Sequence, residues 1–491
     1  KLLNSSTDTS VKEKVLYKLD VKNYCFNRFT FEETKDAIKN IKCRKSPGLD
    51  NVYGEHFKYA DNVIIILLTL LFNSIVIHGY IPSNIMDTIL IPLIKDKKGN
   101  ITNKDNYRPI AITCIMSKIL ELLVLARIQD IIVSNCNQFG FKPKLGTDMC
   151  VYVLKQIVEY YTSLSSPVYA CFLDASKAFD KINHWHLFNK LLDANVPTII
   201  VRLLYVWYTT QTFYVKWGNI ISKSFNVSNG VRQGGILSPY LFNFYLEELS
   251  NKLSGLNVGC ELPGGICNHL FYADDSVLLS PSPNALQRLL DCCHDFAIKN
   301  ELVYNESKTK CMVFKPKCMS NLYVPCFYLN SVELLVTEKQ KYLGVIITCD
   351  QEDNCDIKRQ IKSVYSRGNV LIRKFKHCTD NVKLKLFSSY CNSFYCAQLW
   401  CMYKKEHVRK LQTAYNRIFR TLMNFKYDVS ISAQFVSKNI DTFTVIWRKL
   451  IVSFRKRLLE SENSILSGIV QSLMFLDSRL TKMWHDKAFS L

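Results

Sequence analysis

The chain has 491 residues, of which 48% are hydrophobic and 21% charged, and this composition excludes an intrinsically disordered protein. Its 63 Lys and Arg residues against 42 Asp and Glu residues give a formal net charge of +21. A surplus of that size predicts a polyanionic partner, usually nucleic acid, but does not distinguish DNA from RNA.

Nineteen cysteines are scattered along the chain without paired spacing, and we find no signal peptide. We therefore expect reduced thiols in a cytoplasmic and/or nuclear protein that is not secreted. Cys391, Cys396, Cys401 and His407 recur at steps of about five residues in a helical pattern. Zinc sites use tighter Cys pairs separated by loops, so we favour a structural role over a zinc site here.

The first part of the chain predicts mostly helices. Thr30 and Glu33 form a capping box before a helix that runs to Ile41, and a helix is expected over about 54–78. Within the second helix, the apolar run 63–72 is too short to span a bilayer, so it predicts a buried helix and no membrane partner. The other expected elements are a basic loop at 42–50, a strand at 88–94, a polar loop at 99–107 and an amphipathic helix at 116–133.

Further along, strands and helices alternate from 168 to 350, which predicts an α+β fold class. An apolar strand over 168–174 ends at Asp174, and a glycine-rich loop at 229–239 runs into a helix. After about 354 the pattern is almost wholly helical and basic. These basic helices suit contact with a duplex backbone, and the alternative is a plain solvated helix face.

Two adjacent aspartates mark the most informative segment, 269–280. Asp274 and Asp275 lie between two short apolar runs, which predicts a strand, a tight turn and a returning strand. Adjacent carboxylates repel and raise each other's pKa unless a cation binds there. With Asp174, they predict a three-carboxylate cluster for a hard divalent metal and two-metal phosphoryl chemistry.

Three segments follow one another along the chain: the strand that ends at Asp174, the glycine-rich loop at 229–239 with Gln233, and the hairpin with Tyr272-Ala273-Asp274-Asp275. Their order and spacing resemble the reverse transcriptases of non-LTR (long-interspersed-element-like) retrotransposons. Eight blocks, and a ninth beyond the polymerase, match this family in order along most of the chain. They are Lys45–Asp50, Asn106–Ile110, Gln138–Lys142, Phe172–Asp180, Gly230–Pro239, Tyr272–Asp275, Asn305–Lys308, Lys341–Gly344 and, beyond the polymerase, Leu386–Arg420.

The resemblance implies a right-hand polymerase with fingers, a palm with an antiparallel sheet, and a thumb, followed by a helical C-terminal region. The expected divisions are an N-terminal helical extension (1–44), fingers (45–165), palm with finger insertions and primer grip (166–350), a helical thumb (351–400) and a basic helical C-terminal region (401–491). The implied activity is RNA-directed DNA polymerisation, and the implied partners are an RNA template, a DNA primer or target, and dNTPs.

The same resemblance assigns roles to residues at the reaction centre. Asp174 and Asp274 become the principal ligands of two Mg²⁺ ions, for which Mn²⁺ can substitute, and Asp275 becomes the third ligand. Neighbouring strand residues face opposite ways, so Asp275 is ranked below the other two. Lys308 is a candidate general acid that protonates the leaving pyrophosphate, and an exposed strand-end lysine is its alternative.

Other residues would hold the nucleotide and the primer. Phe179 would lie under the incoming sugar and exclude a 2′-hydroxyl, while Arg108 would pair with the triphosphate. Their alternatives are a core phenylalanine and a surface arginine. Gln233 and Gly234 would line the nucleotide pocket, whereas Asp180 more simply orients the local helix. The primer grip would comprise Tyr342, Leu343 and Gly344.

No second acidic or histidine constellation suggests a nuclease, and the chain begins at Lys1 rather than Met, so we expect a fragment that lacks an endonuclease. Two other functions stay open. One is an intron-maturase-like polymerase, and the other is a domesticated or decayed copy that only binds nucleic acid. The sequence does not indicate the oligomeric state.

Overall fold

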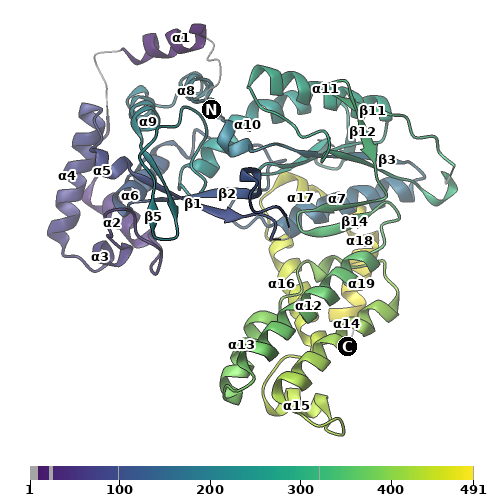
Figure 1. Cartoon of the computed structure of the whole chain (residues 1–491). Coiled ribbons are helices and arrows are strands. Elements are labelled where there is room, and N and C mark those ends of the chain that lie inside the picture. Colours follow the sequence, from purple (N-terminus) through teal and green to yellow (C-terminus); the bar gives the residue numbers. More distant parts are fainter. Residues whose placement is uncertain (1–8, 21–25, 98, 320, 490–491) are drawn as a thin grey trace. The chain divides into compact units, whose positions relative to one another are not determined.

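The computed structural model describes residues 9–20, 26–97, 99–319 and 321–489, which form two compact units (Figure 1). The first unit comprises Lys1–Asn135, Ala175–Asn251 and His294–Tyr304. The second comprises Cys136–Asp174, Lys252–Cys293 and Asn305–Leu491. Each unit is built from segments that are far apart in the sequence.

The first unit combines helices with a small sheet. Its helices are α1 (Thr9–Leu19), α2 (Phe31–Asn40), α3 (Gly54–Lys58), α4 (Asn62–His78), α5 (Ser83–Met86), α6 (Ile115–Ile128), α8 (His184–Asp193), α9 (Thr198–Thr210), α10 (Ser238–Gly255) and the 3₁₀ turns η1 (Lys104–Asn106) and η2 (Ala178–Lys181). Its strands are β1 (Thr88–Ile94), β2 (Tyr107–Thr113), β4 (Phe213–Trp217) and β5 (Ile220–Ile221), in the order β2-β1-β4-β5.

In this unit, two local predictions from the sequence are confirmed and two helix bounds differ. Glu33 N donates to Thr30 Oγ1 and Thr30 N to Glu33 Oε2, so the capping box starts α2 as expected. Strand β1 has the expected bounds. The expected helix over 54–78 is interrupted, because the Asp61 side chain accepts from Val63 N and starts α4 as a separate helix. The helix expected to reach 133 ends at Ile128.

Helix α4 is only half buried, so the expectation of a buried helix was wrong. Ile65, Leu68 and Phe72 are buried on the face that packs toward α2 and α9, whereas Val63 and Leu70 are 58% and 59% exposed. Only one face of the helix finds partners within its unit. Among the residues that the structure describes, no helix combines the length and apolar character that crossing a membrane requires.

The second unit has a six-stranded sheet with helices packed against it and a helical C-terminal part. Its strands are β3 (Val168–Asp174), β6 (Cys260–Leu262), β7 (Gly265–Cys267), β8 (His269–Tyr272), β9 (Asp275–Ser280), β10 (Lys310–Phe314), β11 (Phe327–Leu329), β12 (Val332–Val336), β13 (Lys339–Tyr342) and β14 (Val345–Thr348). The large sheet has the order β11-β12-β10-β3-β9-β8, and β6-β7 and β13-β14 form separate hairpins.

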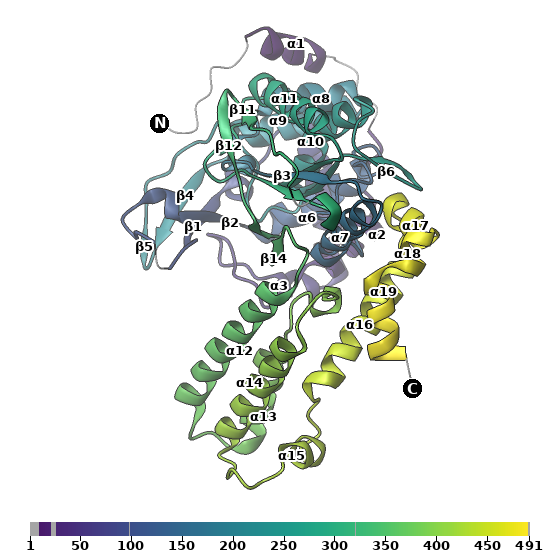
Figure 2. The same ribbon diagram turned by 90° about the vertical axis from the view of Figure 1, so that its right-hand side faces the viewer.

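The helices of this unit are α7 (Thr147–Ser163), the part of α11 (Pro283–Lys299) up to Cys293, α12 (Asn354–Phe375), α13 (Asp380–Cys391), α14 (Lys405–Met423), α15 (Ile431–Ser437), α16 (Phe443–Leu459), α17 (Ser464–Val470), α18 (Leu473–Asp477), α19 (Arg479–Trp484), the 3₁₀ turns η3 (Lys317–Met319) and η4 (Ala397–Leu399), and the π-helical η5 (His485–Phe489). Helix α7 packs against β3 and β8, and α12, α13 and α14 lie side by side (Figure 2). The helical pattern expected after 354 is confirmed.

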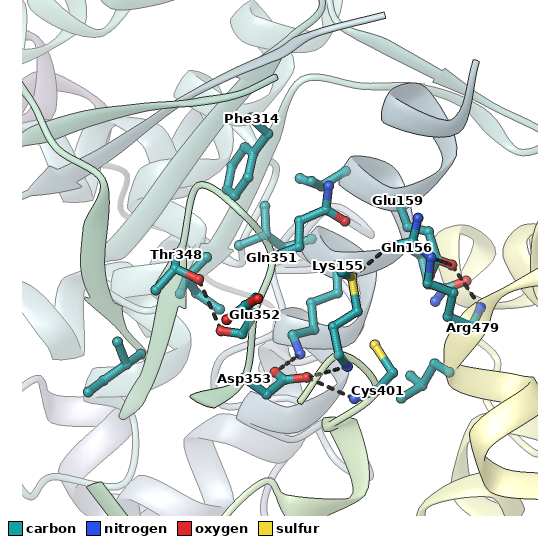
Figure 3. A pocket seen from close by; sticks show the side chains of 16 residues that line it. Lys155, Gln156, Glu159, Phe314, Thr348, Gln351, Glu352, Asp353, Cys401 and Arg479 are labelled. Atoms are coloured by element: carbon teal, nitrogen blue, oxygen red, sulfur yellow. Dashed lines mark hydrogen bonds and ion pairs between the residues drawn. The ribbon is translucent and has the colours of Figure 1, made fainter. Parts of the chain in front are cut away.

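A buried ion pair joins α7 to the start of α12. Lys155 Nζ lies 2.5 Å from Asp353 Oδ1, and Asp353 Oδ2 accepts from the backbone N–H groups of Cys401 and Met402 (Figure 3). These groups lie beside a cavity of about 30 Å³. Asp353 is 2% exposed, and both of its carboxylate oxygens are hydrogen-bonded. It therefore fixes the junction between α7 and the C-terminal helices within the second unit.

The cysteines expected to be reduced are free thiols wherever the structure describes them. Cys391 and Cys396 are buried in the apolar core of the second unit, together with Trp400 and Tyr415. Their surroundings are therefore those of small core residues.

Candidate active site

The hairpin of β8 and β9 carries the two adjacent aspartates. Tyr272 and Asp275 pair across the hairpin, and Ala273 and Asp274 form its two-residue turn. Ala273 has φ 58°, a left-handed conformation that alanine rarely adopts. Asp274 and Asp275 are both exposed. The expected strand, turn and returning strand are confirmed, with Asp274 in the turn and Asp275 as the first residue of β9.

Strand β3 brings the third aspartate to the same place. It pairs antiparallel with β9, and Asp174 is the direct partner of Asp275. Residues that oppose each other in this way share a face and have Cβ atoms roughly 4.5–5.5 Å apart. The preceding residues Val168–Leu173 are at most 4% exposed, whereas Asp174 is half-buried at the strand end. The two carboxylates therefore oppose each other where the buried strand reaches solvent.

An open hollow of about 340 Å³ lies at this strand end. Its lining residues are Phe172, Leu173, Asp174, Asp275, Ser276, Ser307, Lys308, Lys310, Gln340, Lys341 and Tyr342. Asp274 does not line it. The sequence ranked Asp275 third among the acids, but the structure gives Asp275 the position that faces Asp174.

Lys308 lies where it can act in this hollow. Its Nζ is 3.8 Å from Asp174 Oδ2, and its side chain is 68% exposed. The segment that carries it also holds the end of β3, since Asn305 N donates to Asp174 O and Asp174 N donates to Thr309 Oγ1. The backbone of Asp174 is therefore fixed on both sides, while the Lys308 side chain is largely exposed.

Among the described residues, no group of three or more His, Cys, Asp or Glu side chains gathers closely enough to hold a metal. The structure thus brings Asp174 and Asp275 together without joining Asp274 to them in one set. Mg²⁺ is usually bound through one or two carboxylates plus substrate phosphates, so this pair fits a divalent ion. Like charges directly opposite on a sheet also favour a cation between them.

The first unit holds the residues expected to bind the nucleotide. Ala111 N donates to Gln233 O at 2.7 Å, and Gln233 Nε2 donates to Asp180 Oδ1 at 2.8 Å. Burial raises the pKa of the Asp180 carboxyl, while the Gln233 hydrogen bond opposes that rise. Gly234 has φ 117°, and a Cβ there would lie 2.7 Å from Ala111 O. Both the conformation and the close approach to β2 require glycine.

Phe179 and Arg108 lie in the same unit as this loop. The Phe179 ring stacks on Phe242 with centroids 4.2 Å apart and planes 6° from parallel. The backbone carbonyl of Phe179 accepts from Val231 N. The ring is half-buried, so one stacked face is fixed while part of the ring stays accessible. Arg108 is exposed in β2, and its positive charge opposes the burial that raises the pKa of Asp180.

The three residues expected to grip the primer form the end of the β13–β14 hairpin. Tyr342 is 4% exposed, and its hydroxyl lies 3.2 Å from Cys150 Sγ. Leu343 and Gly344 have φ 44° and 82°, as a two-residue hairpin turn with positive φ at both positions requires. Tyr395 Oη donates to Leu343 O at 2.8 Å. The Tyr342 ring is thus core, and the turn itself is the accessible part.

The sequence profile of the family described as reverse transcriptase (RNA-dependent DNA polymerase) matches residues 94–347, just over half of the chain. The chain belongs to the reverse transcriptase family. The matched range includes the β3 strand end, the glycine-rich loop, the β8–β9 hairpin and the turn at Leu343–Gly344.

Curated relatives extend this similarity beyond the matched range. The RNA-directed DNA polymerase from mobile element jockey of Drosophila funebris is 27% identical over 80% of this chain and 44% of its own length. A probable RNA-directed DNA polymerase from transposon X-element of Drosophila melanogaster is 24% identical over 81% of this chain and 44% of its length. The Pol polyprotein of the type-2 retrotransposable element R2DM of that species is 27% identical over 64% of this chain. The chain spans less than half the length of these relatives.

One residue that supports the reverse transcriptase loop was missed in the sequence. Glu121 on α6 is fully buried, lies 2.5 Å from Arg232, and accepts from the backbone N–H groups of Ile236 and Leu237. The available signal was a lone glutamate among apolar residues at 115–128. Glu121 therefore holds the backbone after Gly234 and Gly235, and its ion pair holds Arg232 just before them. Removing either partner would leave a buried charge unpaired.

We predict that Gly234→Ala destabilises this reverse transcriptase more than Gly218→Ala does. Gly218 also has positive φ, at 59°, but a Cβ there would meet nothing within 4 Å. The control should lower the free energy of unfolding by about 1–2 kcal/mol through backbone strain alone. Gly234→Ala adds the clash with Ala111 O. Urea unfolding of both variants measures the difference, and equal losses would show that the loop does not need its close approach to β2.

Proposed function

We propose that this chain is an RNA-directed DNA polymerase of a non-LTR retrotransposon, which adds dNTPs to a primer 3′-hydroxyl on an RNA template. The names of the jockey, X-element and R2DM relatives support this function, and so does the net charge of +21. Its partners are then the RNA template, a DNA primer or target, and dNTPs. A reducing cytoplasmic or nuclear location remains a prediction.

The single observation that carries the proposal is the opposition of Asp174 and Asp275 across β3 and β9. This anionic pair lies in a hollow that Lys308, Lys310 and Lys341 also line. Carboxylates suit divalent ions and the lysines suit phosphate oxygens, so the hollow has the charges that a metal-bound triphosphate needs. Neither a purely structural turn nor an apolar ligand would need this arrangement.

We assign Asp174 and Asp275 as the metal ligands that the geometry favours. The family resemblance alone adds Asp274, in the adjoining turn, as a third ligand, since Asp274 does not line the hollow. Two Mg²⁺ ions, replaceable by Mn²⁺, would activate the primer hydroxyl and stabilise the charge of the leaving pyrophosphate. The protein's own part is to hold the carboxylates in place, which the buried strand β3 and the segment 305–309 do.

Lys308 has the exposure and position of a general acid. Its Nζ reaches Asp174 Oδ2 at 3.8 Å from a largely exposed stem, so it can turn toward a leaving pyrophosphate in the same hollow. A positioned ammonium would give its proton to the leaving oxygen as the bond to the α-phosphate breaks. The ion pair with Asp174 holds the lysine nearby before substrate arrives.

The nucleotide-binding roles rest on the family resemblance and on geometry within the first unit. Asp180 fixes the amide of Gln233, so this side chain is preorganised beside the backbone of Gly234. Phe179, held by Phe242, would lie against the sugar and exclude a 2′-hydroxyl. The guanidinium of Arg108, exposed in β2, would pair with the triphosphate.

The division into fingers, palm and thumb belongs to the same proposal. We take the sheet of β3, β8, β9 and β10 as palm, helices α12 and α13 (within 351–400) as thumb, and the turn at Leu343–Gly344 as the primer grip. Because Tyr342 is buried, the backbone of the turn rather than the tyrosine ring would contact the primer. The basic helices after 354 would contact the duplex backbone.

A primer-extension assay on an RNA template with dNTPs and Mg²⁺ tests the function. We expect the protein to extend the primer, and Asp174→Asn or Asp275→Asn to reduce incorporation by at least about a hundredfold, because the metal loses a ligand. Template–primer binding should persist in both variants. Asp193→Asn, on a carboxylate of α8 that pairs with Lys18, is the control and should extend normally. Binding without incorporation, with either Mg²⁺ or Mn²⁺, would contradict the proposal.

Sugar selection gives a second test. Phe179→Ala should raise incorporation of rNTPs relative to dNTPs by about tenfold or more, since the ring no longer fills the space of the 2′-hydroxyl. Phe225→Ala is the matched control, because Phe225 is also a partly exposed ring stacked on a neighbour, Phe213. Competition between labelled rNTP and dNTP measures the ratio. An unchanged ratio in Phe179→Ala would assign that ring to the core alone.

A further inference from the structure

We propose that Gln138 is a positioning residue that sets the conformation of the turn at Ala273–Asp274, and through it the place of Asp275. The resemblance assigned the segment Gln138–Lys142 to the fingers without a role for its glutamine. The inference rests on the proposed function for the role of Asp275, and on the contacts of the second unit for everything else.

The segment before the glycine forms a short extra strand beside the hairpin. Phe139 N donates to Phe271 O and Phe271 N donates to Asn137 O, both at 2.8 Å, and Gln138 pairs in parallel with Phe271. Asn137 Nδ2 also donates to His269 O at 2.7 Å. Since β8 ends the order of the six-stranded sheet, this segment covers the strand edge that would otherwise be open.

The Gln138 side chain then reaches the turn itself. Its Oε1 accepts from Ala273 N at 3.0 Å and from Gly140 N at 2.8 Å, and the residue is 2% exposed. Its buried Nε2 has no hydrogen-bond partner. The amide is therefore placed for its acceptor oxygen, and that oxygen binds the one residue of the turn that has a left-handed conformation.

Gly140 packs directly against the backbone of the same turn, at Tyr272 and Ala273. A Cβ on this residue would lie 2.4 Å from Ala273 N and 3.0 Å from the carbonyl carbon of Tyr272. The φ angle of Gly140 is not in the left-handed region, so the glycine is needed for this close approach and not for its own conformation. Ala273 is thus held by a hydrogen bond and by direct backbone contact.

The consequence concerns the carboxylates. Asp274 and Asp275 follow Ala273 directly, and Asp275 opposes Asp174 through the first pair of the β3–β9 ladder. A turn that relaxes away from its unusual conformation would therefore move the Asp275 carboxylate relative to Asp174. Residues that orient metal ligands typically change metal affinity or activity by about 10- to 100-fold when mutated.

Gln138→Met tests this with a side chain of similar length and no acceptor. We expect it to weaken Mn²⁺ binding by about 10- to 100-fold, measured from the free-ion signal in an electron paramagnetic resonance titration of the whole chain. Gly140→Ala perturbs the same turn by contact instead of hydrogen bonding and should weaken binding in the same direction. Half-saturating Mg²⁺ in primer extension should rise in parallel.

Gln156→Met is the matched control. Gln156 is also 2% exposed, lies on α7 of the same unit, and has an Nε2 without a partner. Its substitution should leave Mn²⁺ affinity unchanged, even if the melting temperature falls as much as in Gln138→Met. Wild-type affinity in a folded Gln138→Met or Gly140→Ala protein would overturn the inference, as would an equal loss in the control. Loss of fold in both test variants would also overturn it, because these residues would then hold the sheet and not the turn.

The metal titration separates this inference from the proposed function. If the wild-type chain incorporates no nucleotide yet binds Mn²⁺ in a manner that depends on Gln138, the polymerase proposal fails and the positioning role stands. If the wild-type chain extends primers while both turn variants keep full metal affinity, the function stands and the positioning role fails.

Discussion

The antiparallel pairing of β3 with β9 is the constraint on which the candidate site depends. It places Asp174 directly opposite Asp275 at the one end of a buried strand that reaches solvent. Two carboxylates in that relation repel, and their repulsion opposes folding unless a cation compensates it. Lys308 supplies part of that compensation, at 3.8 Å from Asp174. A divalent ion would supply the rest, so the same charge arrangement that opposes pairing of β3 with β9 would favour a bound cation.

Both units hold their functional backbone by buried polar groups rather than by regular structure alone. In the second unit, Gln138 and Gly140 hold the turn before Asp275. In the first, Glu121 holds the backbone after the glycine pair, and Asp180 holds the Gln233 side chain. Turns and glycine-rich loops have many accessible conformations, so each needs such partners to present its side chains in one geometry.

The sequence predicted the elements whose signals are local. The capping box at Thr30, the strand at 88–94, the hairpin at 269–280 and the helices after 354 follow from patterns within a few residues, and the structure confirms them. It did not predict which acid faces Asp174, because strand register depends on pairing between segments a hundred residues apart. Glu121 and Gln138 were missed for the same reason, since their partners are distant in the sequence. The exposed face of α4 could not be predicted either, because an apolar run does not show which face of the helix will pack against other helices.

The most direct test of this account compares the unfolding temperature of the wild-type chain, Asp174→Asn and Asp275→Asn with and without Mg²⁺. Without the ion, each variant should melt at or above the wild-type temperature, because the substitution removes the repulsion between opposed carboxylates. With the ion, only the wild type should gain stability, because binding to the folded state raises its melting temperature. No rise in the wild-type melting temperature with Mg²⁺, or an equal rise in all three proteins, would show that the two aspartates do not form a metal site.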